Sequence, residues 1–229
     1  MDIRTVKMGR IKAIIFDLDD TLLDNAPLMD SSLRQGIAAM IAKGFKVDID
    51  EALVVIKKII EKDARKDKFL ELARHYGQKD LKLIEQGRKA YATADIKELV
   101  HFSGVAETLA LLHATFTLVL VTQGNPAQQR KKIALLGISH YFDHILTPHT
   151  GEKEQAFRES MNLLKLTADE ILIVGDRIDA EIKMGNKLGM TTVRILQGKY
   201  SRLSPEHELE KPDFTIKEIK EVIAIVHES

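Results

Sequence analysis

Short apolar runs, each followed by a polar, small or acidic residue, constrain the fold of this chain more than any other feature. Four clear runs cover residues 11–16, 117–121, 171–174 and 191–195, and residues 144–146 form a shorter fifth. The runs are rich in Ile, Val and Leu and do not alternate with polar residues. This pattern is typical of strands that are buried on both faces of a parallel sheet.

Helical patterns lie between these runs. Asn125 followed by Pro126 is a good helix start, and Gly137 is a good stop. Thr215 and Glu218 form a possible capping box for a final amphipathic helix. Further helices are expected over residues 127–136, 152–164 and 179–188. This alternation of strands and helices predicts an α/β fold with a doubly wound parallel sheet.

Residues 24–99 break the alternation. They contain no convincing strand and four helical patterns, over residues 28–43, 49–62, 68–76 and 81–91. We therefore expect a helical cap domain at residues 24–99, inserted into an α/β core made of residues 1–23 and 100–229. A length of 229 residues is consistent with one to two domains.

Charge and composition exclude several classes of function. The chain has 34 basic and 34 acidic residues, which argues against a general nucleic-acid binder or a polybasic membrane-surface protein. The absence of cysteine excludes disulfides, thiolate metal sites and cysteine nucleophiles. Residues 1–10 have no apolar stretch, and no apolar run approaches the roughly 18 residues of a membrane span. We expect a cytoplasmic protein without a signal peptide.

The carboxyl ends of the predicted strands carry the polar residues of interest. Ligands of open α/β sheets bind outside these ends, so Asp17, Asp19, Thr122 and Asp176 are expected at one edge of the sheet. Residues 17–21 (DLDDT) are the strongest single signal. Acidic residues at strand ends also serve as turn contacts or helix caps, so this segment alone does not decide the function.

Four motifs in order resemble those of the haloacid dehalogenase-like (HAD) hydrolases. They are residues 15–22 (IFDLDDTL), residues 121–124 (VTQG), Lys153 within residues 151–154 (GEKE), and residues 174–181 (VGDRIDAE). The resemblance runs from about residue 11 to residue 195, and the helical insertion resembles the cap of subfamily I of that family. It implies a HAD core, an aspartate nucleophile and a phosphatase that acts on a small phosphorylated metabolite.

Charge balance leads to the same chemistry. A phosphate monoester brings about two negative charges, and Asp17 and Asp176 add two more. The site therefore needs a divalent cation with oxygen ligands, and Mg²⁺ is expected. Mg²⁺ and Lys153 together still leave the sum near minus one. This favours a protonated Asp19 with a raised pKa, which would act as a general acid.

The resemblance assigns a role to each motif residue. Asp17 attacks phosphorus and becomes an aspartyl-phosphate, while Asp19 protonates the leaving alcohol and later activates water. The phosphoryl oxygens are held by the Thr122 hydroxyl, Lys153 and the N–H groups around Gln123 and Gly124. The implied metal ligands are the carboxylates of Asp17 and Asp176 and the carbonyl of Asp19, with Glu181 in support.

Three of these positions leave alternatives open. Glu181 fits the family spacing, where it would reach the metal through water or bond to Lys153, but Asp179 is also available. Lys153 stands in a charged segment, and a solvated helix start would look the same. Asp20 occupies a position where glycine is common in the family, and it would be a turn residue.

Other functions are compatible with the same motifs. A phosphomutase would use the same aspartyl-phosphate and pass it to another oxygen. A haloacid dehalogenase would not need Asp19 or Asp176, and a non-catalytic regulatory protein should have lost at least one motif residue. Neither the substrate nor the oligomeric state is indicated by the sequence.

Overall fold

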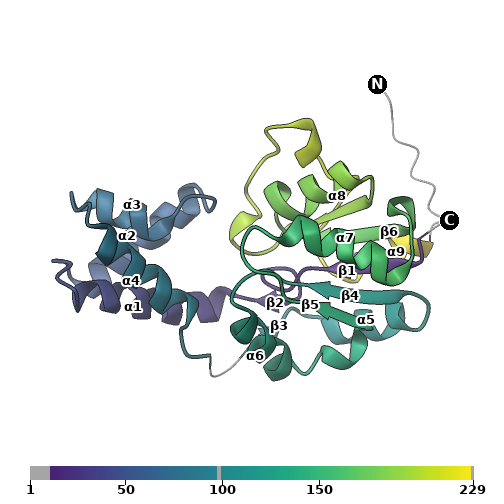
Figure 1. The fold of residues 1–229 in the computed structure, drawn as a ribbon, viewed down its shortest axis with the longest axis horizontal. Helices are drawn as coiled ribbons and strands as arrows, with labels where there is room; N and C mark the ends of the chain where they lie inside the picture. The colour runs from purple at the N-terminus through teal and green to yellow at the C-terminus, as the bar shows by residue number, and fades with distance from the viewer. Residues whose placement is uncertain (1–10, 97–98, 228–229) are drawn as a thin grey trace. The chain divides into compact units, whose positions relative to one another are not determined.

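The computed structural model describes residues 11–96 and 99–227, and its internal contacts divide it into two compact units (Figure 1). The sheet unit lies within residues 1–24 and 100–229, and the helical unit lies within residues 25–99. Residues 1–10, over which the sequence predicts no signal peptide, lie outside the described residues. Among the residues described, no helix has the length and apolar character to cross a membrane.

Six parallel strands form the main sheet, in the order β5-β4-β1-β6-β7-β8. Their bounds are β1 Ala13–Phe16, β4 Thr117–Val121, β5 His144–Leu146, β6 Ile171–Gly175, β7 Thr191–Ile195 and β8 Phe214–Ile216. β1 is central, with Phe16 beside Leu120 of β4 and Val174 of β6. The predicted α/β fold with a parallel sheet is confirmed.

Both faces of the central strands are buried, which explains why their sequences do not alternate. Ala13 and Ile15 of β1 share a core cluster with Ala156 and Phe157 of α7 (Lys153–Leu164). Because successive side chains of a strand point to opposite faces, Ile14 and Phe16 face the other side, and they too are fully buried. Figure 1 shows α5 (Val105–His113) on the side of the sheet away from α7.

The helices of the sheet unit begin and end largely where the sequence predicts. α6 (Pro126–Leu136) starts after Asn125, whose side chain accepts the N–H groups of Ala127 and Gln128. It ends at Gly137, which has a φ of +67°. α8 covers only Lys183–Leu188, because residues Ile178–Ile182 of the predicted helix form a wider π-helical turn, η4.

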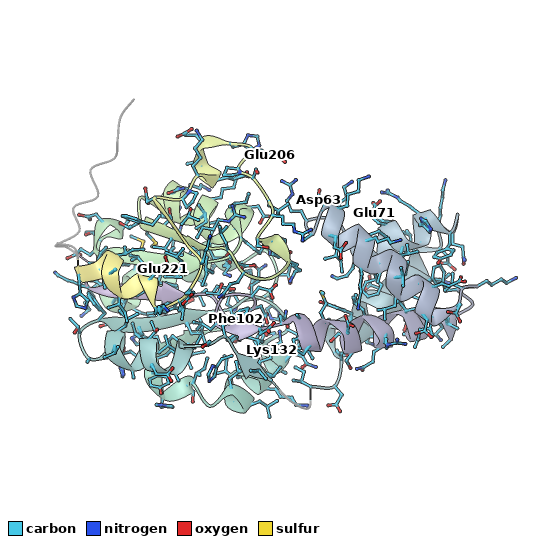
Figure 2. The ribbon with its side chains drawn as sticks, turned by 180° about the vertical axis from the view of Figure 1, so that it is seen from behind. Asp63, Glu71, Phe102, Lys132, Glu206 and Glu221 are labelled. Carbon is cyan, nitrogen blue, oxygen red and sulfur yellow. The ribbon has the colours of Figure 1, made fainter. Side chains whose placement is uncertain are left out.

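The predicted capping box at Thr215 and Glu218 is wrong. Thr215 belongs to β8, and α9 (Glu221–His227) begins later than predicted. The side chain of Glu221, labelled in Figure 2, accepts the N–H groups of Lys217 and Glu218 instead. β8 has only three residues, and Thr215 at its centre is exposed. Such a short segment has the same sequence pattern as a helix N-cap.

The helical unit has a core of its own. Its helices are α1 Ala26–Ile41, α2 Ile49–Lys62, α3 Lys68–His75 and α4 Leu81–Ala92. The side chains of Asp48, Asp67 and Asp80 cap the N-termini of the last three. Gly36 and Gly87 admit the ring of Phe69, since a Cβ on either would lie within 3 Å of it.

A two-stranded antiparallel ribbon lies where the chain leaves and re-enters the sheet unit. β2 (Leu23–Asp24) pairs with β3 (Val100–His101), with Leu23 beside His101. Asp24, which the sequence assigns to the inserted domain, therefore pairs within the sheet unit. This ribbon and helix α5 are elements that the sequence patterns do not indicate.

Candidate active site

Three predicted site residues follow neighbouring strands of the sheet. Asp17 comes directly after β1, Thr122 after β4 and Asp176 after β6. Since β4 and β6 both pair with β1 in parallel, their carboxyl ends meet at one edge. The N–H of Asp17 donates to the carbonyl of Val174 at 3.0 Å, which continues the ladder to the site. Asp17, Thr122 and Asp176 are all buried.

Lys153 is buried at the first turn of α7 and is not a solvated helix start. Its Nζ donates to Oδ1 of Asp17 at 2.5 Å and to Oε1 of Glu181. Burial alone would lower the pKa of Lys153, but the two carboxylates outweigh burial and raise it. Burial raises the pKa of Asp17, Lys153 opposes this shift and Glu181 adds to it. The structure thus brings the first, third and fourth motifs into direct contact.

Glu181 reaches this cluster because of local backbone features of the fourth motif. It lies in the π-helical turn η4, a kind of turn often found at functional sites. Gly175 leaves room for it, since a Cβ there would lie 2.4 Å from Cγ of Glu181. Its Oε2 accepts the N–H of Arg177 at 3.1 Å. Of the alternatives open for Glu181, the structure contains the hydrogen bond to Lys153.

Asp179 is directed to a different partner. Its two carboxylate oxygens accept from Nε and Nη2 of Arg177 at 3.1 and 3.0 Å. Arg177 in turn stacks over the ring of Tyr200 at 4.9 Å. The charge of Asp179 is therefore balanced by Arg177, and Asp179 does not take part in the cluster around Lys153.

Asp19 differs from the expectation that its pKa is raised. Its Oδ1 accepts from Nζ of Lys132 at 2.6 Å, and its Oδ2 accepts from Nε2 of Gln129 at 3.0 Å. Burial favours a higher pKa, but Lys132 and the hydrogen bond from Gln129 outweigh it and lower the pKa of Asp19. The sequence-based charge count included a bound phosphate and Mg²⁺ but left out Lys132, which lowers the pKa of Asp19 in the protein alone.

The second motif supplies a side chain and one main-chain donor. Oγ1 of Thr122 accepts from Nε2 of Gln129 at 2.8 Å, so the hydroxyl hydrogen is free to donate. The N–H of Gly124 donates to the carbonyl of Pro148 at 3.1 Å, which contradicts its predicted use as an anion donor. The N–H of Gln123 has no acceptor among the described residues.

Asp20 is more than a turn residue. It has a left-handed φ of +61°, is buried, and its Oδ2 accepts from Nζ of Lys199 at 3.0 Å. Gly198 lies against it, since a Cβ there would be 2.3 Å from the side chain of Asp20. The residue before Lys199 therefore has to be small for Asp20 to stay in place.

Asp176 is the feature that most clearly indicates a missing partner. Both of its carboxylate oxygens are buried, and neither has a hydrogen-bond donor among the described residues. Burial raises the pKa of Asp176 well above its usual value, and the nearby Glu181 and Asp17 add to the shift. A buried carboxylate with two unsatisfied oxygens is costly unless a cation or a donor binds it.

The donor set fits a hard divalent cation that keeps some of its water. Among the described residues, no three His, Cys, Asp or Glu side chains are grouped as a metal site. Mg²⁺ needs fewer protein side chains than this, since it is usually held by one or two carboxylates together with waters and phosphate oxygens. Asp176 and Asp17 provide such carboxylates, while the Lys153 contact leaves Oδ2 of Asp17 available.

Comparison with known proteins decides the family. A family model described as a haloacid dehalogenase-like hydrolase matches residues 11–189. The chain belongs to the haloacid dehalogenase-like hydrolases. The resemblance inferred from the four motifs is thereby confirmed.

Relatives with curated names give the class of reaction in this family. The glyceraldehyde 3-phosphate phosphatase of Methanocaldococcus jannaschii is 33% identical over 94% of this chain and 97% of its own length. The phosphoglycolate phosphatase of Aquifex aeolicus is 27% identical over 94% of this chain and 97% of its own. The predicted enzyme class, a phosphatase of the HAD family, is confirmed.

A solved structure supports the HAD fold, including the helical insertion. The HAD hydrolase YfnB of Bacillus subtilis, described as bound to magnesium, has a TM-score of 0.70 and 20% identity, covering 95% of this chain and 99% of that protein. At this identity the likeness concerns the fold.

The HAD motifs do not include Gln129, Lys132 or Lys199, and these three residues were missed in the sequence.

Proposed function

We propose that the protein is a Mg²⁺-dependent phosphatase of a small phosphate monoester that works through an aspartyl-phosphate on Asp17. The observation that carries the proposal is the buried Asp17, which pairs with Lys153 and interacts electrostatically with Asp176, a carboxylate that has no donor among the residues described. Five buried or half-buried carboxylates (Asp17, Asp19, Asp20, Asp176 and Glu181) face three ammonium groups (Lys132, Lys153 and Lys199) and the guanidinium of Arg194, which interacts with Asp176. A divalent cation would balance this excess of negative charge.

Each residue has a role in the transfer. The carboxylate of Asp17 attacks phosphorus in line, the bond from phosphorus to the ester oxygen breaks, and Asp19 gives its proton to the departing oxygen. A phosphate dianion next to Asp19 favours its protonated form, which offsets Lys132. Water then attacks the aspartyl-phosphate, Asp19 takes its proton, and inorganic phosphate leaves with the carboxylate of Asp17 restored.

The remaining residues hold charge and geometry. Lys153 pairs with Asp17 and supplies a positive charge to a phosphoryl oxygen, and Thr122 donates its hydroxyl hydrogen to another. The N–H of Gln123 is a third donor. Asp17, Asp176 and the carbonyl of Asp19 would hold Mg²⁺, and Glu181 keeps Lys153 in place. When bound, Mg²⁺ would neutralise the negative charge that develops on the phosphoryl group.

Glyceraldehyde 3-phosphate is the first substrate to test. The relative with this activity in its name is 33% identical over 94% of the chain, compared with 27% for the phosphoglycolate phosphatase. We therefore expect a higher kcat/KM for glyceraldehyde 3-phosphate than for phosphoglycolate. A cytoplasmic location and the lack of nucleic-acid or membrane partners stay predictions.

Asp17→Asn is the direct test of the proposed reaction. The variant should lose turnover of glyceraldehyde 3-phosphate and of para-nitrophenyl phosphate in the presence of Mg²⁺, because an amide is not a competent nucleophile. Asp179→Asn is the matched control, because Asp179 pairs with Arg177 and should leave turnover close to that of the wild type. Near-normal rates in Asp17→Asn would contradict the mechanism.

The same assay separates a phosphatase from a phosphomutase. The phosphatase releases inorganic phosphate from a single substrate, while a mutase forms a bisphosphate intermediate. Treatment with a chelator should remove activity, and added Mg²⁺ should restore it. Activity that persists after chelation would contradict the metal requirement.

A further inference from the structure

Asp19, the proposed acid and base, is held on both oxygens by a single helix. Oδ1 of Asp19 accepts from Lys132 at 2.6 Å and Oδ2 accepts from Gln129 at 3.0 Å. The two donors are three residues apart on α6, so they lie on the same face of the helix. More than 100 residues separate them from Asp19 in the sequence.

Gln129 also connects Asp19 to the second motif. Its buried Nε2 lies 3.0 Å from Oδ2 of Asp19, 2.8 Å from Oγ1 of Thr122 and 3.0 Å from the carbonyl of Gln123. Because this amide donates to Thr122, the hydroxyl hydrogen of Thr122 has to point elsewhere. One side chain thereby fixes both the carboxylate of Asp19 and the direction in which Thr122 donates.

The start of α6 sets the position of both donors. Asn125 caps the helix through the N–H groups of Ala127 and Gln128, directly after the second motif. Lys132, labelled in Figure 2, is half-buried, with a side chain that is 12% exposed. A lysine held in this way gives Asp19 a charged partner that is largely screened from solvent.

We propose that Gln129 and Lys132 are positioning residues that orient Asp19 for proton transfer to the leaving group, with Gln129 also orienting Thr122. This inference rests on the proposed function. A carboxylate held on both oxygens cannot rotate freely, so its proton meets the leaving oxygen in one geometry. Misplacement of a catalytic group by about 1 Å can cost about 100-fold in rate.

Leaving-group dependence distinguishes this role from a merely structural one. An alkoxide, such as that from glyceraldehyde 3-phosphate, needs protonation to depart, whereas para-nitrophenolate departs without it. The value of kcat/KM reports the steps up to departure of the leaving group. Lys132→Met should lower kcat/KM about 10–100-fold for glyceraldehyde 3-phosphate and less than about 3-fold for para-nitrophenyl phosphate.

Companion variants make the test specific. Lys132→Arg should recover most of the lost activity, because its guanidinium can also donate to Asp19. Gln129→Met removes the amide donors at similar length; it should lower kcat/KM for both substrates through Thr122, and more for glyceraldehyde 3-phosphate through Asp19. Lys131→Met, an exposed lysine on the same helix, is the matched control and should behave as wild type.

The outcomes separate failure of this inference from failure of the proposed function. Activity that survives Asp17→Asn would overturn the proposed function itself. The positioning role is refuted if Asp17→Asn is inactive while Lys132→Met lowers kcat/KM equally for both substrates. It is also refuted if Lys132→Met changes only KM. Thermal unfolding identifies variants that fail to fold. If Gln129→Met is unstable, Lys132→Met carries the test, because Lys132 is less deeply buried than Gln129.

Discussion

Replacing Asp176 by asparagine should make the metal-free protein more stable, although the residue is buried at the centre of the site. Both carboxylate oxygens of Asp176 lack a donor within the described part of the chain, and burial together with the acids Glu181, Asp17 and Asp20 raises its pKa. The positive charge of Lys199 opposes this shift but does not cancel it. An asparagine carries no charge, and its amide can donate to the neighbouring carboxylates.

The gain follows from the cost of an unsatisfied buried group. Leaving such a group without a partner costs about 1–3 kcal/mol, so we expect Asp176→Asn to raise the free energy of unfolding by about 2 kcal/mol at pH 8. In a chain of this length this corresponds to about 4–8 °C in Tm. The pKa of Asp176 is raised on folding, so the folded state keeps its proton to higher pH than the unfolded chain does. The gain should therefore shrink as the pH falls toward 3.8, the ordinary pKa of aspartate.

Mg²⁺ should reverse the order of stability. At a concentration of about 100 times its Kd, a ligand that binds only the folded state stabilises it by about 2.7 kcal/mol. The wild type should gain this amount and Asp176→Asn should gain little, so the variant unfolds at higher temperature in chelator and at lower temperature in Mg²⁺. Differential scanning calorimetry at pH 8 measures both, with Asp179→Asn as the control that responds to Mg²⁺ as wild type. A variant that is less stable in chelator, or equally stabilised by Mg²⁺, would refute the reasoning.

Three further predictions concern stability and are measured by urea unfolding. Gly198→Ala should lower the free energy of unfolding by about 1–3 kcal/mol, because its φ is +61° and its Cβ would overlap Asp20; an unchanged midpoint would contradict this. Phe69→Ala should lower the free energy of unfolding of the helical unit by about 3–5 kcal/mol, because it leaves a cavity in that unit's core. Asp48→Ala should cost about 1 kcal/mol by removing the N-cap of α2, whereas the exposed Asp50→Ala should cost less.

The sequence predicts the fold well where local patterns coincide with tertiary structure. Strand β4 and helix α2 have the predicted bounds, because a fully buried strand and a strongly amphipathic helix leave clear signals. β8 was missed because it is short and has Thr215 exposed at its centre, so its pattern resembles a helix cap. Helix α5 was missed because its start at Gly104 has no side-chain cap.

The candidate site is predictable only as far as its motifs. Asp17 and Asp176 follow apolar strands, and each is visible from its own neighbours in the sequence. Lys132 and Lys199 pair with Asp19 and Asp20, from which more than 100 residues separate them, and nothing in their local sequence marks either as special. A charge count made from the motifs leaves out Lys132, which lowers the pKa of Asp19 in the protein alone.

The contact between Asp20 and the loop after β7 has an evolutionary consequence. Glycine at position 20 would adopt the left-handed backbone without strain, but it would remove the carboxylate that pairs with the half-buried ammonium of Lys199. Conversely, a side chain at position 198 would collide with Asp20. Positions 20, 198 and 199 should therefore change together among related proteins. Related proteins with glycine at position 20 should lack lysine at position 199 and should tolerate residues other than glycine at position 198.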